Sequence, residues 1–283
     1  MTSRRDLLRL AVGGGLTLAA LAACGGERGA TTTSSPAAGD PLAPLTPIRT
    51  PTPDAPPRRL IALSSADLDV LHALGREPEA AWAVDGTGPR PWRERPAPPR
   101  PGWEGPGLPG LRSLLPFGVD AFVLAAADVS ADQLRGYERL AAVIVDPEGR
   151  PGWRAHLDLV AGALDRDPAP AAGPTEEALD AWTRGQRRLG VEALAVVVGT
   201  GAGPDTPVAT LAADSPFGAE VRALGVDVLA HGEPRPYREL RRPGVQVVRV
   251  DPRDGDLVAA VRQPSVASLP WALEQLVRGR RPA

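Results

Sequence analysis

The densest group of chemically capable side chains lies in a proline-rich stretch between residues 85 and 110. An arginine guanidinium forms paired hydrogen bonds with carboxylate or catecholate oxygens, and an indole ring offers a flat face to an aromatic ligand. A surface insertion rich in arginine and proline, without any ligand, explains this composition equally well. The candidate ligand-binding residues in the stretch are Arg90, Trp92, Arg93 and Trp103.

Two further pairs of polar residues follow segments that we expect to be strands. Ser64 and Ser65 come after a short apolar run, and Arg235 and Tyr237 lie in the stretch 231–237. In open α/β sheets, ligands contact the residues that follow the strands. Both pairs are therefore candidate ligand-binding residues, although Ser64 also suits a helix N-cap and the second pair also suits an ordinary surface loop.

Histidine is the natural ligand for zinc or manganese, and the chain contains three histidines. His72 and His156 fall inside expected helices, where a single histidine is more often packed or on the surface. Only His231 falls in a loop that follows a strand. A metal site of three histidines is therefore the weaker hypothesis, and we expect neither a resident metal nor another cofactor.

The motifs of hydrolases and of phosphate-binding enzymes are incomplete in this sequence. Residues 199–203 read Gly-Thr-Gly-Ala-Gly after an expected strand, but the third glycine of G-x-G-x-x-G is missing. The chain has no lysine, which excludes a Walker lysine. Ser64, Asp85 and His231 would form a catalytic triad only by coincidence. We therefore expect no enzyme, with an exported hydrolase kept as an alternative.

Charge and cysteine content narrow the classes of partner. The 32 basic residues, all arginine, nearly balance 34 acidic residues, so the overall charge offers no reason to bind nucleic acid. Cys24 is the single cysteine, which excludes an intramolecular disulfide. Hydrophobic residues make up 43% of the chain, enough for one larger domain or two small lobes.

The N-terminal segment is typical of an export signal. Arg4 and Arg5 precede an uncharged apolar run over 10–23, too short for a permanent membrane span and suited to a signal peptide. The run ends in Leu-Ala-Ala-Cys, which resembles a bacterial lipobox, and the paired arginines resemble a twin-arginine signal. An ordinary Sec lipoprotein signal is the alternative. We expect residues 1–23 to be removed, Cys24 to carry lipid, and the proline-, threonine- and serine-rich residues 24–57 to be a disordered tether.

The remaining chain alternates short apolar runs with amphipathic segments, which indicates an α/β fold. Helices that end in Ala-Leu-Gly precede a strand in both halves, and this repetition suggests two similar lobes. We expect strands at 59–63, 80–84, 121–125, 142–145, 193–198, 208–211, 226–229, 245–250 and 257–261, and helices at 67–74, 130–140, 153–164, 176–189, 217–224 and 269–277.

The order of these segments resembles the class III solute-binding proteins of ABC importers, which carry ferric siderophores, haem, cobalamin and some metal ions. The similar phrases are Leu-Ile-Ala-Leu-Ser at 60–64, Asp-Val-Leu-His-Ala-Leu-Gly at 69–75, Gly-Val-Asp-Ala-Phe-Val-Leu at 118–124, and residues 217–225. The resemblance implies two Rossmann-like βα lobes, residues 58–150 and 191–283, joined by a single linking helix within 151–190 (at 174–189, with 168–174 irregular). It places the ligand cleft between the lobes.

The resemblance also implies the partners. A ferric siderophore-like chelate would bind in the cleft, and the protein, as a monomer, would deliver it to the permease of an ABC importer from the outer face of the membrane. Asp69 and Glu239 would be the carboxylates that dock onto the permease, although each is equally well explained as an ordinary solvated acid. A zinc- or manganese-binding member of the same fold and a degenerate lipoprotein that serves only for interactions are the remaining alternatives.

Overall fold

The protein is described by a computed structural model that covers residues 55–82, 89–93, 107–124, 129–146, 152–199, 203–230 and 233–278. The predicted signal peptide, the predicted lipidation site Cys24 and most of the predicted tether lie outside these residues. So do three of the residues considered above: Asp85, Trp103 and His231. None of the described helices combines the length and the apolar character that crossing a bilayer would need.

The N-terminal lobe is built on four parallel strands, β1 (Leu60–Ala62), β2 (Ala80–Ala81), β3 (Ala121–Leu124) and β4 (Ala142–Val145). Their order across the sheet is β2-β1-β3-β4, and Leu60 pairs with Ala121. Nearly every strand residue is buried, as expected for a parallel sheet that is covered on both faces. The helices of this lobe are α1 (Ser65–Ala73), α2 (Leu111–Leu114) and α3 (Ala131–Glu138), with a single 3₁₀ turn at Leu115–Phe117.

Local capping chemistry sets the ends of these helices. Ser64 accepts a hydrogen bond from a first-turn amide of α1, and Gly75, at φ 70°, takes the left-handed conformation that ends it. Ser130 and Gln133 form a reciprocal capping box at the start of α3. These signals were readable in the sequence, so the predicted helices at 67–74 and 130–140 are confirmed to within a few residues.

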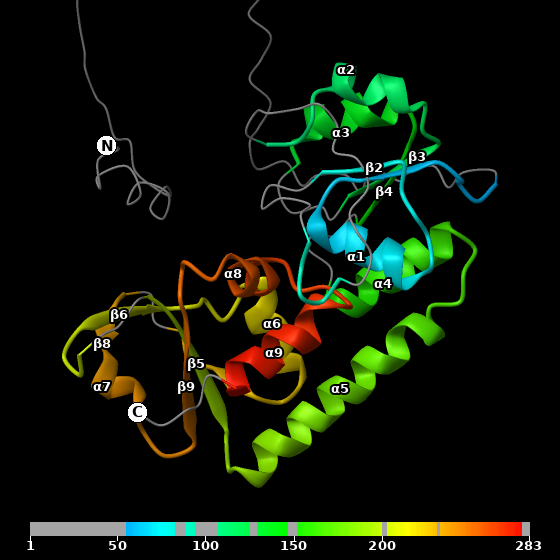
Figure 1. The fold of residues 1–283 in the computed structure, drawn as a ribbon. Helices are drawn as coiled ribbons and strands as arrows, with labels where there is room; N and C mark the ends of the chain where they lie inside the picture. Colours follow the sequence, from blue (N-terminus) through cyan, green and yellow to red (C-terminus); the bar gives the residue numbers. More distant parts are fainter. Residues whose placement is uncertain are drawn as a thin grey trace, which may run out of the picture. The chain divides into compact units, whose positions relative to one another are not determined.

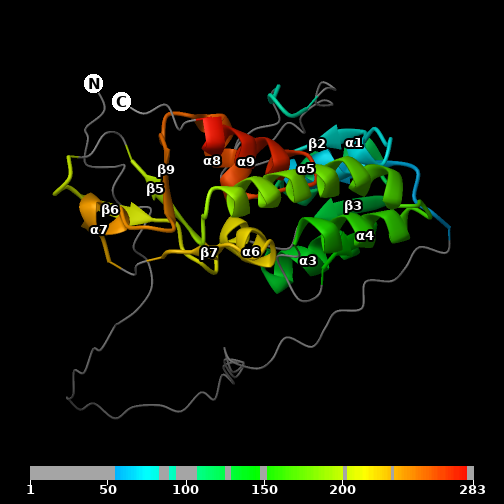
Figure 2. The ribbon, with the colours of Figure 1, turned by 90° about the horizontal axis from the view of Figure 1, so that it is seen from below.

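Two helices follow β4 along the chain: α4 (Trp153–Ala163), which packs on α1 and β4 of the first lobe, and α5 (Ala169–Arg188), which links the lobes. The prediction that residues 168–174 are irregular is wrong, because α5 begins at Ala169. Pro170 fits the first turn, where backbone N–H groups have no partner within the helix, and Pro174 lies inside the helix at the loss of one hydrogen bond. Figure 1 and Figure 2 show α5 running from beside α4, in the first lobe, to the strands of the second lobe.

The C-terminal lobe is organised around a central strand, β5 (Ala193–Val198), which pairs with β9 (Val245–Val250) in parallel along its whole length. On its other side, β7 (Asp227–Val228) pairs in parallel with the start of β5, and β6 (Pro207–Thr210) pairs antiparallel with its end. A two-residue strand, β8 (Arg235–Pro236), extends the sheet beyond β6. The helices are α6 (Pro216–Ala223), α7 (Tyr237–Leu240), α8 (Gly255–Arg262) and α9 (Ser268–Arg278).

The predicted strand at 257–261 is wrong, because these residues lie in α8. Asp254 caps this helix by accepting a hydrogen bond from the amide of Leu257, and the apolar side chains of Leu257, Ala260 and Val261 are buried. A short apolar run has no periodicity that separates a buried strand from a buried helix. The capping acid outside the run was the signal that identifies the helix.

One hydrophobic cluster runs through both lobes. Leu60 and Val123 on one face of the first sheet share it with Leu194 and Val196 of the second, and with the packed faces of α4, α5, α8 and α9. The opposite faces of the two sheets pack in separate clusters, around Phe122 in the first lobe and around the smaller group at Val197 in the second. The two lobes therefore share one continuous core.

Candidate functional site

The sheet order identifies where each lobe can receive a ligand. In the first lobe the chain passes from β1 outward to β2 and then returns to add β3 on the other side, so the switch point lies between β1 and β3. In the second lobe, β7 and β9 flank β5 in the same manner. Ligands of open α/β sheets bind beyond the carboxyl ends of the strands at such points. Ser64 and Ser65, which follow β1, therefore lie at the predicted crevice.

Both serine hydroxyls already have partners inside the protein. The Ser64 hydroxyl donates to Oδ2 of Asp67 at 2.6 Å and accepts from the backbone N–H of Asp67 at 3.0 Å. The Ser65 hydroxyl accepts from Nη2 of Arg93 at 2.9 Å. Both serines are also buried. The structure thus assigns them a capping and a positioning role, and ligand contact by either stays a prediction.

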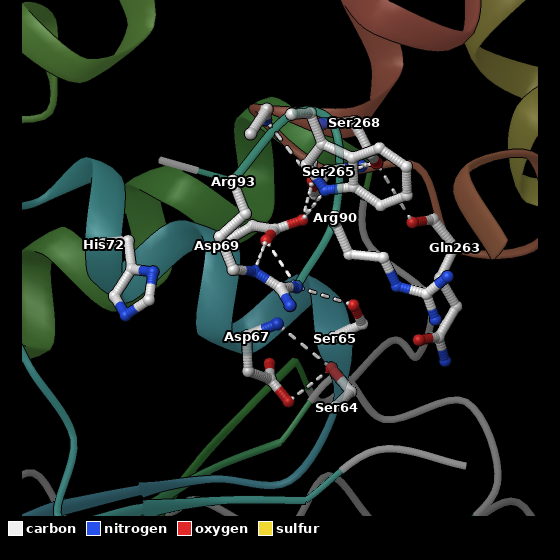
Figure 3. A network of polar contacts seen from close by, with 12 residues as sticks. Ser64, Ser65, Asp67, Asp69, His72, Arg90, Arg93, Gln263, Ser265 and Ser268 are labelled. Carbon is white, nitrogen blue, oxygen red and sulfur yellow. Dashed lines mark hydrogen bonds and ion pairs between the residues drawn. The ribbon is translucent and has the colours of Figure 1, made fainter. Parts of the chain in front are cut away.

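The buried carboxylate of Asp69, on α1, is the centre of a polar network (Figure 3). Its Oδ1 accepts from Nε and Nη2 of Arg93 at 2.9 and 2.8 Å. Its Oδ2 accepts from Nε1 of Trp92 at 2.9 Å and from the hydroxyl of Ser265 at 2.7 Å. Four donors therefore saturate this carboxylate.

This environment corrects the prediction that Asp69 docks onto a permease. The side chain of Asp69 is 2% exposed and that of Arg93 is 1% exposed, so neither charge is offered to a partner surface. A buried ion pair is retained only where further hydrogen bonds satisfy both groups, and this pair meets that condition. Glu239, the other predicted docking residue, lies on the short helix α7 and keeps 45% of its side chain exposed, 3.6 Å from Arg235. Its docking role stays a prediction.

The short segment 89–93 joins the two lobes. Arg90 pairs with Asp256 of α8 at 2.7 Å, and its guanidinium lies 5.8 Å from the ring centre of Trp92. The ring of Trp92 in turn lies 4.8 Å from that of Trp271 on α9, at an interplanar angle of 48°. Three of the predicted ligand-binding residues, Arg90, Trp92 and Arg93, are therefore brought together, but the contacts shown here are made to other parts of the chain.

The predicted residues Arg235 and Tyr237 lie elsewhere, at β8 and the first position of α7. The guanidinium of Arg249, on β9, covers the ring of Tyr237 at 4.5 Å. These residues form the edge of the C-terminal sheet, and their ligand-binding role stays a prediction.

The two described histidines are engaged separately. Nε2 of His156 lies 2.9 Å from Oδ1 of Asp67, and both side chains are buried. Nε2 of His72 lies 3.6 Å from Glu77. Among the residues that the structure describes, no three histidine, cysteine or acidic side chains gather as a metal site would require.

Ser64, Asp67 and His156 form a serine–aspartate–histidine chain, but in an order that does not suit hydrolysis. Asp67 stands between the serine and the histidine, whereas a catalytic triad needs the imidazole next to the hydroxyl in order to accept its proton. The arrangement instead fixes the first turn of α1 against α4.

A second contact between the lobes involves Glu220 of α6. Its Oε1 accepts from the backbone N–H of Trp153 at 2.7 Å and so caps the start of α4. Burial raises the pKa of the Glu220 carboxyl above its ordinary value, and the hydrogen bond from Trp153 offsets part of this rise. A Cβ at Gly152 would lie 2.9 Å from the same oxygen, so glycine suits this close approach.

Sequence reasoning missed the C-terminal partners of this network: Asp256, Ser265 and Trp271. Ser265 lies 196 residues from Asp69, and its hydroxyl also accepts from the backbone N–H of Ser268 at the start of α9. The local signal was the Gln-Pro-Ser-x-x-Ser sequence at 263–268, which predicts a helix break and a new cap. Nothing local predicted the contact with α1.

A cavity of about 620 Å³ adjoins the network between α5 and α9. Trp182 lines it together with Trp92 and Trp271. Pro174, Thr175 and Ala178 of α5 and Pro270 and Glu274 of α9 complete most of the wall.

The arrangement of two sheets around one linking helix matches that of known solute-binding proteins. A periplasmic solute-binding protein from Mycobacterium smegmatis superposes with a TM-score of 0.58 at 16% identity, covering 79% of this chain and 93% of that chain. The chain has the class III solute-binding protein fold. No protein-family model and no curated protein sequence matches it.

The same fold occurs in siderophore-binding proteins. The iron-uptake protein PiaA of Streptococcus pneumoniae, in complex with ferrichrome, superposes with a TM-score of 0.60 at 11% identity, covering 80% of this chain and 92% of that chain. The catecholate-siderophore-binding protein VctP of Vibrio cholerae gives 0.53 at 15% identity, with 80% and 94% covered.

Proposed function

We propose that this protein is a lipid-anchored extracytoplasmic solute-binding protein that captures a ferric siderophore-like chelate and delivers it to an ABC importer. The observation that carries the proposal is the likeness of its two lobes to proteins such as the ferrichrome-bound PiaA, over four fifths of the chain.

The arrangement within the lobes supports this proposal. Both sheets have a switch point at the carboxyl end of a central strand. A crevice between these two ends would allow each lobe to contact one side of a small molecule. The Asp69 network and the cap at Glu220 tie the lobes together, which limits the entropy lost on binding.

The lipid anchor rests on the sequence. The lipobox-like Leu-Ala-Ala-Cys ending at Cys24, the paired arginines before it and the polar tether after it are the order expected of a secreted, membrane-tethered binding protein. Metabolic labelling with a radioactive fatty acid tests this: the label should appear on the wild-type protein and disappear with Cys24→Ala.

Ligand capture is tested by a titration panel. The protein is titrated with ferrichrome, ferric desferrioxamine and a ferric tris-catecholate, each beside its iron-free chelator, and tryptophan fluorescence is recorded. Saturable quenching by one ferric form, with weaker quenching by the iron-free chelator, supports the proposal. A response to zinc or manganese alone would replace it with metal-ion binding, and turnover of ester probes would replace it with hydrolysis. No response to any of these ligands would favour an interaction lipoprotein.

A further inference from the structure

The cavity between α5 and α9 has an unusual lining, because three of the chain's six tryptophans meet there. Trp182 comes from α5, Trp271 from α9, and Trp92 from the segment that joins the lobes. Cavities of roughly 300–1,000 Å³ hold drug-sized ligands, and this one measures about 620 Å³. It is therefore large enough to hold a small organic molecule.

The spacing of the lining residues along α5 and α9 explains why a cavity lies between these helices. The lining residues of α5 recur at 174, 175, 178, 181 and 182, and those of α9 recur at 270, 271, 274 and 277, so each helix contributes one continuous face. Ala178 and Ala181 are short side chains on the α5 face, which leaves room in front of the indole of Trp182. Two facing helices with small residues between large aromatic ones form a pocket instead of closing on each other.

The charge of the lining indicates what kind of molecule fits. Glu274 lies one helical turn after Trp271, on the same face of α9. No arginine or histidine is among the described residues that line the cavity. The faces of aromatic rings carry partial negative charge and attract cations, tryptophan most strongly. Indole faces and a carboxylate together favour a positively charged guest.

The structure already shows one of these rings next to a cation. The guanidinium of Arg90 lies 5.8 Å from the centre of the Trp92 ring, within the range of a cation–π contact. Trp271 leans against Trp92 at 4.8 Å, so the two rings are held in place by each other and by the hydrogen bond from Trp92 to Asp69. Rings that are ordered beforehand lose little entropy when a ligand binds.

We propose that this cavity is a second binding site, for an organic cation that carries a quaternary or tertiary ammonium group on an apolar body. The ammonium group lies at the indole faces of Trp182 and Trp271, near Glu274, and the apolar body lies against Pro174 and Pro270. The ring of Trp92, which already lies next to the guanidinium of Arg90, completes the wall. The site is lined by helices α5 and α9 and not by the residues that follow β1 or β5. It is therefore a different site from the crevice between the sheets, with Trp92 a candidate contact in both.

The test uses the full-length chain labelled with ¹⁵N, in which each indole N–H gives its own NMR signal. The probes are acetylcholine and its uncharged isostere 3,3-dimethylbutyl acetate, which differ only in the positive charge. Acetylcholine should shift the signals of Trp92, Trp182 and Trp271 in a saturable manner and leave those of Trp82 and Trp153, buried elsewhere in the core, unchanged. The isostere should bind at least about fivefold more weakly, since cation–π attraction is lost.

Single substitutions test whether the residues that line the cavity are responsible for acetylcholine binding. Glu274→Gln changes an exposed side chain and should weaken acetylcholine binding about threefold, and Trp182→Leu should weaken it about tenfold. Glu177→Gln, an exposed acid on α5 outside the cavity, is the matched control and should change nothing. The proposal is overturned if acetylcholine shifts no indole signal at millimolar concentration, if the isostere binds equally well, or if Glu177→Gln weakens binding as much as Glu274→Gln. The siderophore titration tests a different site, so the outcome of the acetylcholine experiment neither supports nor contradicts the proposed capture of a ferric chelate.

Discussion

Replacing Asp69 with asparagine should destabilise the protein strongly, although the two side chains have the same shape. The carboxylate accepts two hydrogen bonds on each oxygen, from Arg93 on one side and from Trp92 and Ser265 on the other. An asparagine presents one acceptor and one donor, so one pair of donors must face an NH₂ group. The charge of Arg93, whose side chain is 1% exposed, also loses its counter-ion.

The expected size follows from these losses. Leaving one partner of a buried ion pair without the other costs about 3–5 kcal/mol of unfolding free energy. For a domain of this size, 1 kcal/mol corresponds to roughly 2–4 °C in Tm, so the Tm should fall by about 6–20 °C. Ser265→Ala removes the hydrogen bond to Asp69 that bridges the two lobes and also the one that the hydroxyl accepts from Ser268, and should cost at least about 1.5–3 kcal/mol.

Urea unfolding followed by circular dichroism measures these differences, with Glu239→Gln as the matched control. The carboxylate of Glu239 is exposed and forms only a surface ion pair, so its loss should change the unfolding free energy by less than about 0.5 kcal/mol. A loss below about 1 kcal/mol in Asp69→Asn would refute the view that this carboxylate holds the lobes together.

Two further predictions concern the contact between α6 and α4 and the packing of two helical glycines. Because the folded-state pKa of Glu220 is raised, the contribution of this group to stability is complete at low pH and is lost as the pH rises from about the ordinary value of 4.5 through the raised pKa. Glu220→Gln keeps an acceptor for Trp153, so it should remove this part of the pH dependence and be at least as stable as wild type at pH 7; an unchanged profile of unfolding free energy against pH would contradict the assignment. Gly218→Ala would place a Cβ 2.6 Å from the backbone oxygen of Ala213 and should cost about 1–3 kcal/mol. Gly185→Ala on α5, where a Cβ meets nothing within 4 Å beyond its chain neighbours, should instead stabilise by up to about 1 kcal/mol, and equal effects of the two substitutions in thermal unfolding would disprove the packing argument.

Much of the fold was predictable because its signals are local. The apolar runs at 121–124, 142–145, 193–198 and 245–250 are strands, as predicted, and the caps at Ser130 and Gly75 mark helix ends through contacts within a few residues. The predictions failed where the local pattern is ambiguous. Residues 257–261 are apolar without a period, and two prolines hid the first turns of α5.

The candidate site was predicted only in part. The residue types in the segment 89–93 indicated polar and aromatic chemistry, and three of the predicted residues do lie together. Their hydrogen-bond partners come from α1 and from the ends of α8 and α9, up to 196 residues away in the chain. Such partners leave no pattern in the sequence around Arg93 or Trp92.

The sequence by itself indicated most of the segments that become strands and helices, because these depend on side chains close together in the chain. Only the tertiary structure decided that Asp69 is a buried acceptor instead of a surface acid, and that Trp92, Trp182 and Trp271 line one cavity. The physical reason is that burial and ion pairing depend on which distant surfaces meet, and the continuous core that brings α1, α5 and α9 together exists only in the folded chain.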